Sequence, residues 1–404
     1  MLALAGLLVA ALLTFDVYRT WTPGITAAEL TPYYTSAPAD TLAPTESGPT
    51  PTPAPVPSAT IATNPEIAVP GTLVYVRDGS LWVQSGTTAR QITEPVKGSR
   101  ASQPAFSPDG QWIYYIDTRV TTGRWYDPND LGAIARYTLY YPVLCRIHPD
   151  GTGQKDILPS LVRQGALTTF FWIRQPSVSA TGYSAAVVSD GPTFPGVQDM
   201  GIHYVSLSTG KMADALPLRE NSPLGLSDPR FSPDGNLLAY TMEGRSGSNA
   251  APSIWIYDAR TGVAHKLAGG YRAASWSPDG KDVAATGVSG SKLDVVVLDA
   301  TSGKPVAQVT SDGASWGPVW SPAGDQLVYM HLTGAVVDLN MVYISGSGAN
   351  LGFEIEPHLT EYSGLDGGSP AAWYIPGYGA PPSPSPVGTA VAPTAPAGPS
   401  ATPR

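Results

Sequence analysis

One short pattern returns along the chain and limits its fold more than any other feature. Residues 104–110 (PAFSPDG) recur as 229–235 (PRFSPDG), 274–280 (ASWSPDG) and 318–324 (PVWSPAG). A degenerate copy, 176–182 (PSVSATG), lies between the first two, and a truncated copy, 369–373 (SPAAW), ends the series. From residue 106 to residue 373 the corresponding positions lie 72, 53, 45, 44 and 53 residues apart. Self-similarity at this spacing indicates an array of like structural units, some of which carry insertions.

Each unit is predicted to contain four short β-strands. An aromatic-ended strand leads into Ser-Pro-Asp-Gly, where Pro and Gly occupy the positions that a type I turn favours. A β-branched and aromatic run follows, such as 112–116 (WIYYI), and then a variable loop and another strand, such as 254–257 (IWIY). A polar turn such as 149–153 (PDGTG) leads to a short outer strand, expected for example at 309–310 and 358–360. Four strands in about 45 residues without helical periodicity form one blade of a β-propeller.

The two ends of the repeat region complement each other. Residues 72–92 supply the second, third and fourth strands of a blade, and 369–375 supply a lone first strand. Joining them completes one blade and leaves the ring without an open edge. Counting first strands, the sequence predicts an all-β, six-bladed propeller over residues 71–375.

The turns and the segment 145–153 (CRIHPDGTG) resemble those of the TolB-like six-bladed propellers, which are related to WD40 rings. The resemblance covers 71–375, about three quarters of the chain, and departs from the family at the degenerate copy and at Ala323. Ahead of the propeller an apolar segment and a spacer stand in place of the domain that precedes it in the Tol system. The resemblance therefore implies a shared fold rather than a Tol-Pal role.

The flanking segments differ sharply from this region. Residues 22–70 and 376–404 hold 20 of the 41 prolines, so we expect a disordered Pro/Thr/Ser-rich linker and a disordered Pro-rich tail. Residues 1–21 are predicted to form an apolar helix that anchors the protein in the membrane, with a cleaved signal segment as the alternative. The expected location is a bacterial cell membrane, single-pass, with the propeller outside the cytoplasm, or secretion if the segment is cleaved.

Several kinds of chemistry find no support in the residues. A net charge of −9 without a Lys/Arg cluster argues against nucleic acid as a partner. The single cysteine, Cys145, is expected to be buried, and the five histidines lack metal-ligand spacing, so we predict no metal and no cofactor. The turn aspartates are expected to form turns, and the G-x-S-x-G match at 313–317 is expected to begin a blade strand. We therefore predict a protein without enzymatic activity, with a propeller hydrolase or lyase using an axial channel as the alternative.

The predicted binding surface is the rim that collects the insertions. In a propeller, the loops between second and third strands share one rim with the connections between blades. Here that rim receives the insertions 117–141, 160–176 and 189–201. Aromatic and Arg side chains are enriched at protein interfaces, although aromatics of this kind can also pack insertions onto the ring. The candidate partner-binding residues are Arg124, Trp125, Tyr126, Asp127, Phe171, Trp172, Tyr271, Arg272, Trp316 and Tyr362. The expected ligand is a protein, a peptide or an envelope glycan, and the propeller is expected to be monomeric.

Overall fold

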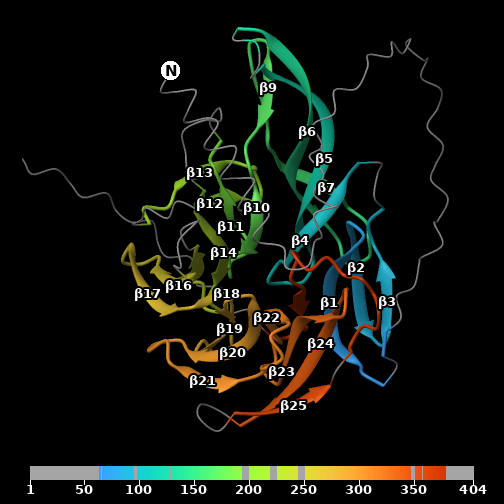
Figure 1. Cartoon of the computed structure of the whole chain (residues 1–404), viewed down its shortest axis with the longest axis vertical. Helices are drawn as coiled ribbons and strands as arrows, with labels where there is room; N and C mark the ends of the chain where they lie inside the picture. Colours follow the sequence, from blue (N-terminus) through green and yellow to red (C-terminus); the bar gives the residue numbers. More distant parts are fainter. Residues whose placement is uncertain are drawn as a thin grey trace, which may run out of the picture.

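The computed structural model describes residues 63–64, 66–94, 98–127, 130, 132–192, 200–218, 225–243, 251–346, 351–356 and 358–378. These residues form 26 β-strands, and none of them is helical. Six antiparallel sheets are arranged around a common centre (Figure 1). The predicted all-β fold with six blades is therefore confirmed.

The six blades follow the repeat order. The first blade contains β4 (Arg100–Phe106), β5 (Ile113–Tyr126), β6 (Ile134–Ile147) and β7 (Lys155–Pro159). The second contains β10 (Arg174–Val178), β11 (Ser184–Ser189), β12 (Gly201–Ser206) and β13 (Met212–Ala215). The third contains β14 (Leu226–Phe231), β15 (Leu237–Met242), β16 (Ser253–Asp258) and β17 (Val263–Gly269). The fourth contains β18 (Tyr271–Trp276), β19 (Asp282–Ser289), β20 (Lys292–Asp299) and β21 (Pro305–Gln308). The fifth contains β22 (Ser315–Trp320), β23 (Gln326–Thr333), β24 (Val336–Ser345) and β25 (Gly352–Glu356). The closing blade joins β26 (Ala372–Tyr374) to β1 (Val69–Arg77), β2 (Ser80–Gly86) and β3 (Thr88–Gln91).

The predicted outer strands at 309–310 and 358–360 are wrong by a few residues. The outermost strands of those blades, β21 and β25, end before these positions. Thr310 and Thr360 instead accept the backbone N–H groups of Val295 and Leu339 through their hydroxyls, at 2.9 and 3.0 Å. These side-chain hydrogen bonds add to backbone ones, because the N–H groups of Val309 and Thr360 still donate to the Val295 and Leu339 carbonyls at 2.9 and 3.3 Å.

The Ser-Pro-Asp-Gly turns are stabilised by their own aspartates. In the first copy the Ser107 hydroxyl donates to Asp109 Oδ1 at 2.5 Å, and the Gln111 N–H donates to the same oxygen at 3.0 Å. The copies at 232–235 and 277–280 repeat both contacts. Where Ala323 replaces the aspartate, the Ser321 hydroxyl donates to Asp325 instead, at 3.0 Å. The prediction that these aspartates form turns is confirmed.

The innermost strands are joined to one another by a repeated bulge. Five of them carry a residue with positive φ at the same place, and the backbone N–H of that residue donates to a side chain of the preceding blade. The bulged residues and their acceptors are Gln103 with Ser369, Gln175 with Gln103, Asp228 with Gln175, Ala273 with Thr241, and Gly317 with Thr286. The closing blade has Pro370 at this place, which has no N–H to donate. Hydrogen bonds thus tie the inner strand of each of these blades to the preceding blade.

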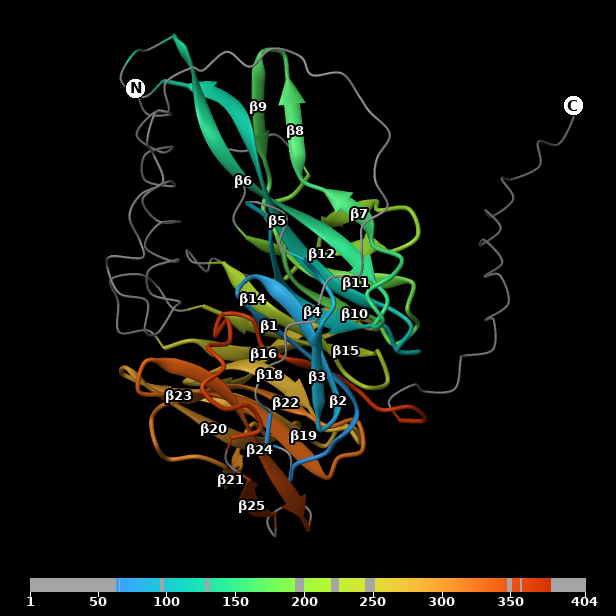
Figure 2. The same ribbon diagram turned by 90° about the vertical axis from the view of Figure 1, so that its right-hand side faces the viewer.

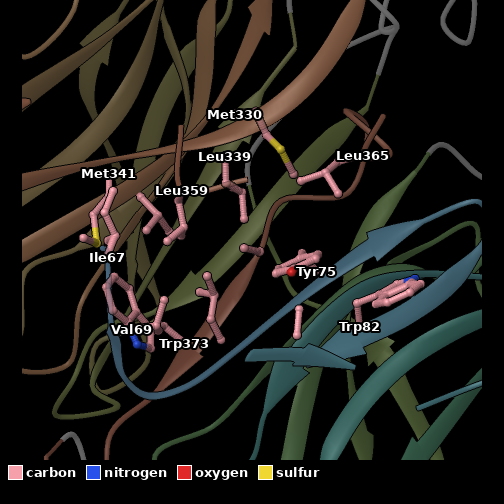
Figure 3. Close-up of a cluster of buried hydrophobic side chains, with 14 of the residues drawn as sticks. Ile67, Val69, Tyr75, Trp82, Met330, Leu339, Met341, Leu359, Leu365 and Trp373 are labelled. Atoms are coloured by element: carbon pink, nitrogen blue, oxygen red, sulfur yellow. The ribbon is translucent and has the colours of Figure 1, made fainter. Parts of the chain in front are cut away.

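The ring closes as the sequence predicts. β26 pairs with β1 in the register Thr72–Tyr374, Leu73–Trp373 and Val74–Ala372. The Trp373 indole is 7% exposed, and its N–H donates to the Pro70 carbonyl at 2.8 Å. Trp373 packs into a hydrophobic cluster that unites the closing blade with the fifth blade (Figure 3). The two ends of the folded region are therefore held by one sheet and one core.

The first blade carries a projection that the sequence did not predict. The segment 117–141 was expected to be an inserted loop, but β5 and β6 are each 14 residues long and continue past their neighbours. β4 pairs with β5 only as far as Thr118, and β7 pairs with β6 only as far as Val143. The hairpin of β8 (Leu161–Gln164) and β9 (Leu167–Phe170) joins the free edge of β5. We call this projecting sheet, residues 119–126, 134–141, 161–164 and 167–170, the extension (Figure 2).

The predicted anchor, 1–21, lies outside the described residues, as does most of the linker, 22–70, and of the tail, 376–404. Within the part that the structure describes, no helix is long and apolar enough to span a bilayer. The folded unit begins earlier than the predicted boundary at residue 71. Ile67 and Val69 are buried in the cluster of Figure 3, and Thr63 forms a β-bridge with Thr360.

Candidate functional site

Within the extension, one face of the hairpin of β5 and β6 is exposed along its whole length. On β5 and β6 the side chains alternate between two faces, as in any strand. Every residue on one face is exposed: Val120, Thr122, Arg124 and Tyr126 from β5, and Ile134, Arg136, Thr138 and Tyr140 from β6. We call this set the arginine face. Four of the nine exposed large hydrophobic side chains among the described residues lie on it, at 39 to 53% exposure. Such a concentration is typical of an interaction surface.

A row of three arginines begins on the arginine face and continues across β9 to β8. Arg124 lies opposite Arg136 on β6 and opposite Thr168 on β9, and Thr168 lies opposite Arg163 on β8. Residues directly opposite in an antiparallel ladder point to the same face. Arg136, Arg124 and Arg163 therefore share one face, and all three are exposed.

The other face of the extension is packed more closely. Trp125 and Tyr137 are half-buried there, and Leu167 is buried. Gly123 also lies on this face. A side chain at this position would overlap Leu139, so the glycine leaves room for the Leu139 side chain to pack over β5. The Trp125 ring contacts the Tyr126 ring edge-on, with their centroids 5.7 Å apart. The extension thus has one packed face and one open face.

An ionic cluster fixes the base of the extension. Arg119 donates to Asp117 at 2.7 Å and binds both carboxylate oxygens of Asp156 at 2.7 Å. The hydrogen bonds from Arg119 hold the pKa of Asp156 below its usual range. Cys145 is buried beside this cluster, as predicted, and its burial raises the pKa of its thiol. The bidentate Arg119–Asp156 pair thus joins β5 to β7 across β6 at the base of the extension.

Two of the predicted binding residues belong to the core. Phe171 is 4% exposed and packs in the core between the first and second blades. Trp316 is 8% exposed, packs in the core of the closing and fifth blades, and donates its indole N–H to the Gly367 carbonyl at 2.8 Å. Both side chains are removed from solvent because they join neighbouring sheets. Neither is available to a partner, and the expectation that they bind one is corrected here.

The remaining predicted residues are distributed over several blades. Trp172 is half-buried, and its backbone N–H donates to the Asp190 carboxylate at 2.7 Å. Burial raises the pKa of Asp190. Tyr271 packs against the core of the third and fourth blades, and Arg272 pairs with Glu243 at 2.5 Å. Tyr362 is 72% exposed.

Of the predicted set, the structure places Arg124 and Tyr126 together on the arginine face. Trp125 lies on the packed face, and Asp127 is half-buried next to them, where its N–H donates to the Ala133 carbonyl at 3.0 Å.

Carboxylates on the inner strands are engaged in scaffold contacts. Asp228 is buried and accepts hydrogen bonds from Gln175 Nε2 at 2.6 Å and from Ser227 Oγ at 3.2 Å. Glu243 accepts the Ser227 hydroxyl at 2.5 Å and pairs with Arg272. These contacts join the second, third and fourth blades. Both carboxylates therefore contribute to the contacts between neighbouring blades.

The G-x-S-x-G match brings a serine next to a histidine and an aspartate. Ser315 Oγ lies 3.0 Å from His331 Nδ1 and 3.0 Å from Asp312 Oδ2. Ser315 is completely buried and begins strand β22, with no helix after it, as the sequence predicts. Asp312 approaches the same ring nitrogen, Nδ1, at 3.7 Å instead of orienting the ring from its other side. These hydrogen bonds from Ser315 to Asp312 and His331 hold the start of β22 in place. In the described part of the chain, no three His, Cys, Asp or Glu side chains converge to hold a metal ion.

Seven residues of the open surface are absent from the predicted set: Val120, Thr122, Ile134, Arg136, Thr138, Tyr140 and Arg163. Six of them stand at even positions over 120–126 and 134–140, and interpreting 117–141 as a loop hid the face that they share. Arg163 joins the row only through the pairing of β8, β9 and β5, which the sequence does not specify.

The sequence matches no protein-family model and no curated protein. Among solved structures, TolB from Acinetobacter baumannii is 19% identical, with a TM-score of 0.50, over 75% of this chain and 66% of that one, just under two thirds of its length. A putative TolB from Agrobacterium tumefaciens is 16% identical, with a TM-score of 0.48, over 78% and 94% of the two chains. An oligogalacturonate lyase from Vibrio parahaemolyticus is 11% identical, with a TM-score of 0.43, over 72% and 92%. At this level of identity the likeness concerns the fold alone, which is that of a TolB-like six-bladed β-propeller.

Proposed function

We propose that this protein is a non-catalytic binding protein whose arginine face binds a partner protein. The observation that carries the proposal is the exposure of all eight residues of that face on a sheet fixed at its base by Arg119. A rigid element lowers the conformational entropy lost on binding. The surface also combines exposed Tyr and Arg with aliphatic side chains, the composition of protein interfaces.

The location of the binding surface is part of the proposal. An apolar segment at 1–21 anchors the chain, and the propeller lies outside the cytoplasm. A linker of 49 residues, extended as polyproline II, reaches about 150 Å. The extension would then meet partners at some distance from the bilayer. A cleaved segment would instead release the same binding protein.

The test removes two neighbouring apolar side chains from the arginine face. Tyr126 and Ile134 lie opposite each other and are 53% and 45% exposed. Replacing both by Ala should weaken capture of partner protein from an envelope extract about thirtyfold, since an anchor residue contributes about 2 kcal/mol. Tyr183→Ala, at an 80% exposed site beside the degenerate turn, is the matched control. Equal capture by both variants, measured by quantitative mass spectrometry, would refute the proposal.

A further inference from the structure

The arginine row imposes an electrostatic cost on the isolated protein. Arg124 and Arg136 lie directly opposite each other, a placement that puts their Cβ atoms about 5 Å apart. Like charges in this arrangement destabilise a sheet. Four other arginines, at 77, 119, 260 and 272, each lie within 3.4 Å of a carboxylate. Arg124, Arg136 and Arg163 form no ion pair with any residue that the structure describes.

We propose that the arginine face recognises an acidic, extended segment of a partner protein, whose carboxylates pair with Arg124, Arg136 and Arg163. The inference rests on the proposed function and names the chemistry of its partner. Guanidinium groups bind carboxylates through paired N–H donors, and such pairs would remove the repulsion within the row.

The dimensions of the row fit an extended chain that crosses the strands. Four neighbouring strands, spaced about 4.8 Å apart, place Arg136 and Arg163 about 14 Å from each other. In an extended segment, side chains on one side recur about every 6.7 Å. Three acidic residues at alternate positions therefore span about 13 Å and reach all three arginines.

The surroundings of the row favour a protein over a polyanionic glycan or a lipid surface. Tyr126 and Ile134 border the row toward the tip, and Val120 and Tyr140 lie on the same face toward the base. Exposed aliphatic side chains beside arginines suit the apolar residues of a peptide. Charge supports an acidic partner of any class: residues 119–141 and 161–170 carry two aspartates and four arginines, of which Arg119 alone is paired within the described residues, whereas the chain has a net charge of −9. The extension is thus a basic element on an acidic protein.

The test uses the full chain and a labelled peptide with glutamate at three alternate positions, together with its glutamine counterpart. Binding is measured by fluorescence anisotropy in about 50 mM and 500 mM salt. We expect the glutamate peptide alone to bind, and its affinity to fall at high salt because the Debye length shrinks to a few ångströms. The triple variant Arg124→Gln, Arg136→Gln, Arg163→Gln should bind at least tenfold more weakly. The control variant Lys211→Gln, Lys292→Gln, Lys304→Gln removes three exposed charges elsewhere and should bind as the original chain does.

A second variant separates recognition from folding. Arg136→Glu should abolish peptide binding and raise the urea midpoint, because it converts the Arg124–Arg136 pair into an attractive one. Unchanged peptide affinity in the triple variant would overturn the inference. Tighter binding of heparin or of phosphatidylglycerol vesicles than of the glutamate peptide would overturn the assignment to a protein. Neither result affects the Tyr126 and Ile134 capture test, so the proposed function is judged separately.

Discussion

Replacing Trp373 by Ala should destabilise the propeller far more than its position near the end of the fold suggests. The indole is 7% exposed and fills the cluster that joins the closing blade to the fifth blade (Figure 3). Truncating a buried Trp costs about 3–5 kcal/mol, and losing the hydrogen bond to Pro70 adds about 1 kcal/mol. The expected loss of about 4–6 kcal/mol is a large part of the 5–15 kcal/mol that stabilises a typical protein.

Urea unfolding followed by tryptophan fluorescence measures this loss. With a slope of about 3 kcal/mol per molar urea, the midpoint should fall by about 1.3–2 M. Tyr362→Ala, at a 72% exposed site, should change the stability by less than about 0.5 kcal/mol. A loss below about 1 kcal/mol in the Trp373 variant would show that ring closure does not depend on this strand.

Two further predictions use contacts of single residues. Gly110→Ala should lower the urea midpoint more than Gly280→Ala. Both glycines have positive φ, but only at Gly110 would the new methyl group overlap another side chain, the ring of Tyr374. Equal losses of stability in the two variants would refute this contact. Asp156→Asn should be less stable than the original chain at pH 7, and this difference should shrink as the pH falls below about 3.9. Arg119 holds the pKa of Asp156 below its unfolded value of about 3.9, so this contribution is present above that value and is lost as pH falls through the folded pKa. The urea midpoints of both proteins, measured across this pH range, test the prediction. A difference in midpoint that does not change with pH would contradict it.

The sequence was sufficient for the ring because each blade repeats the same local signals. The Ser-Pro-Asp-Gly turns fix where first strands end, and the incomplete repeats at the two ends can be satisfied only by pairing with each other. The bulges of the inner strands were not predictable, because Gln103, Asp228 and Ala273 share a backbone conformation but no residue type.

The extension was missed for a physical reason. Over residues 119–126, β5 is exposed on one face and only partly buried on the other. The sequence there (RVTTGRWY) therefore has polar and apolar residues on both faces and a glycine in the middle. Such a strand has little of the alternation on which prediction relies. Phe171 and Trp316 were predicted to face a partner, but both side chains are buried. An aromatic residue next to a turn has the same local sequence in either case, so the sequence does not separate the two.

Site-specific photo-crosslinking in native membranes tests most directly whether the extension is the binding element. A photoreactive phenylalanine analogue is introduced at Tyr126 on the arginine face and, in a second variant, at Tyr183 beside the degenerate turn; these side chains are 53% and 80% exposed. We predict a discrete protein adduct from position 126 that salt and the glutamate peptide suppress, and none from position 183. An adduct from position 183 alone would contradict the assignment and place the binding surface on the opposite rim.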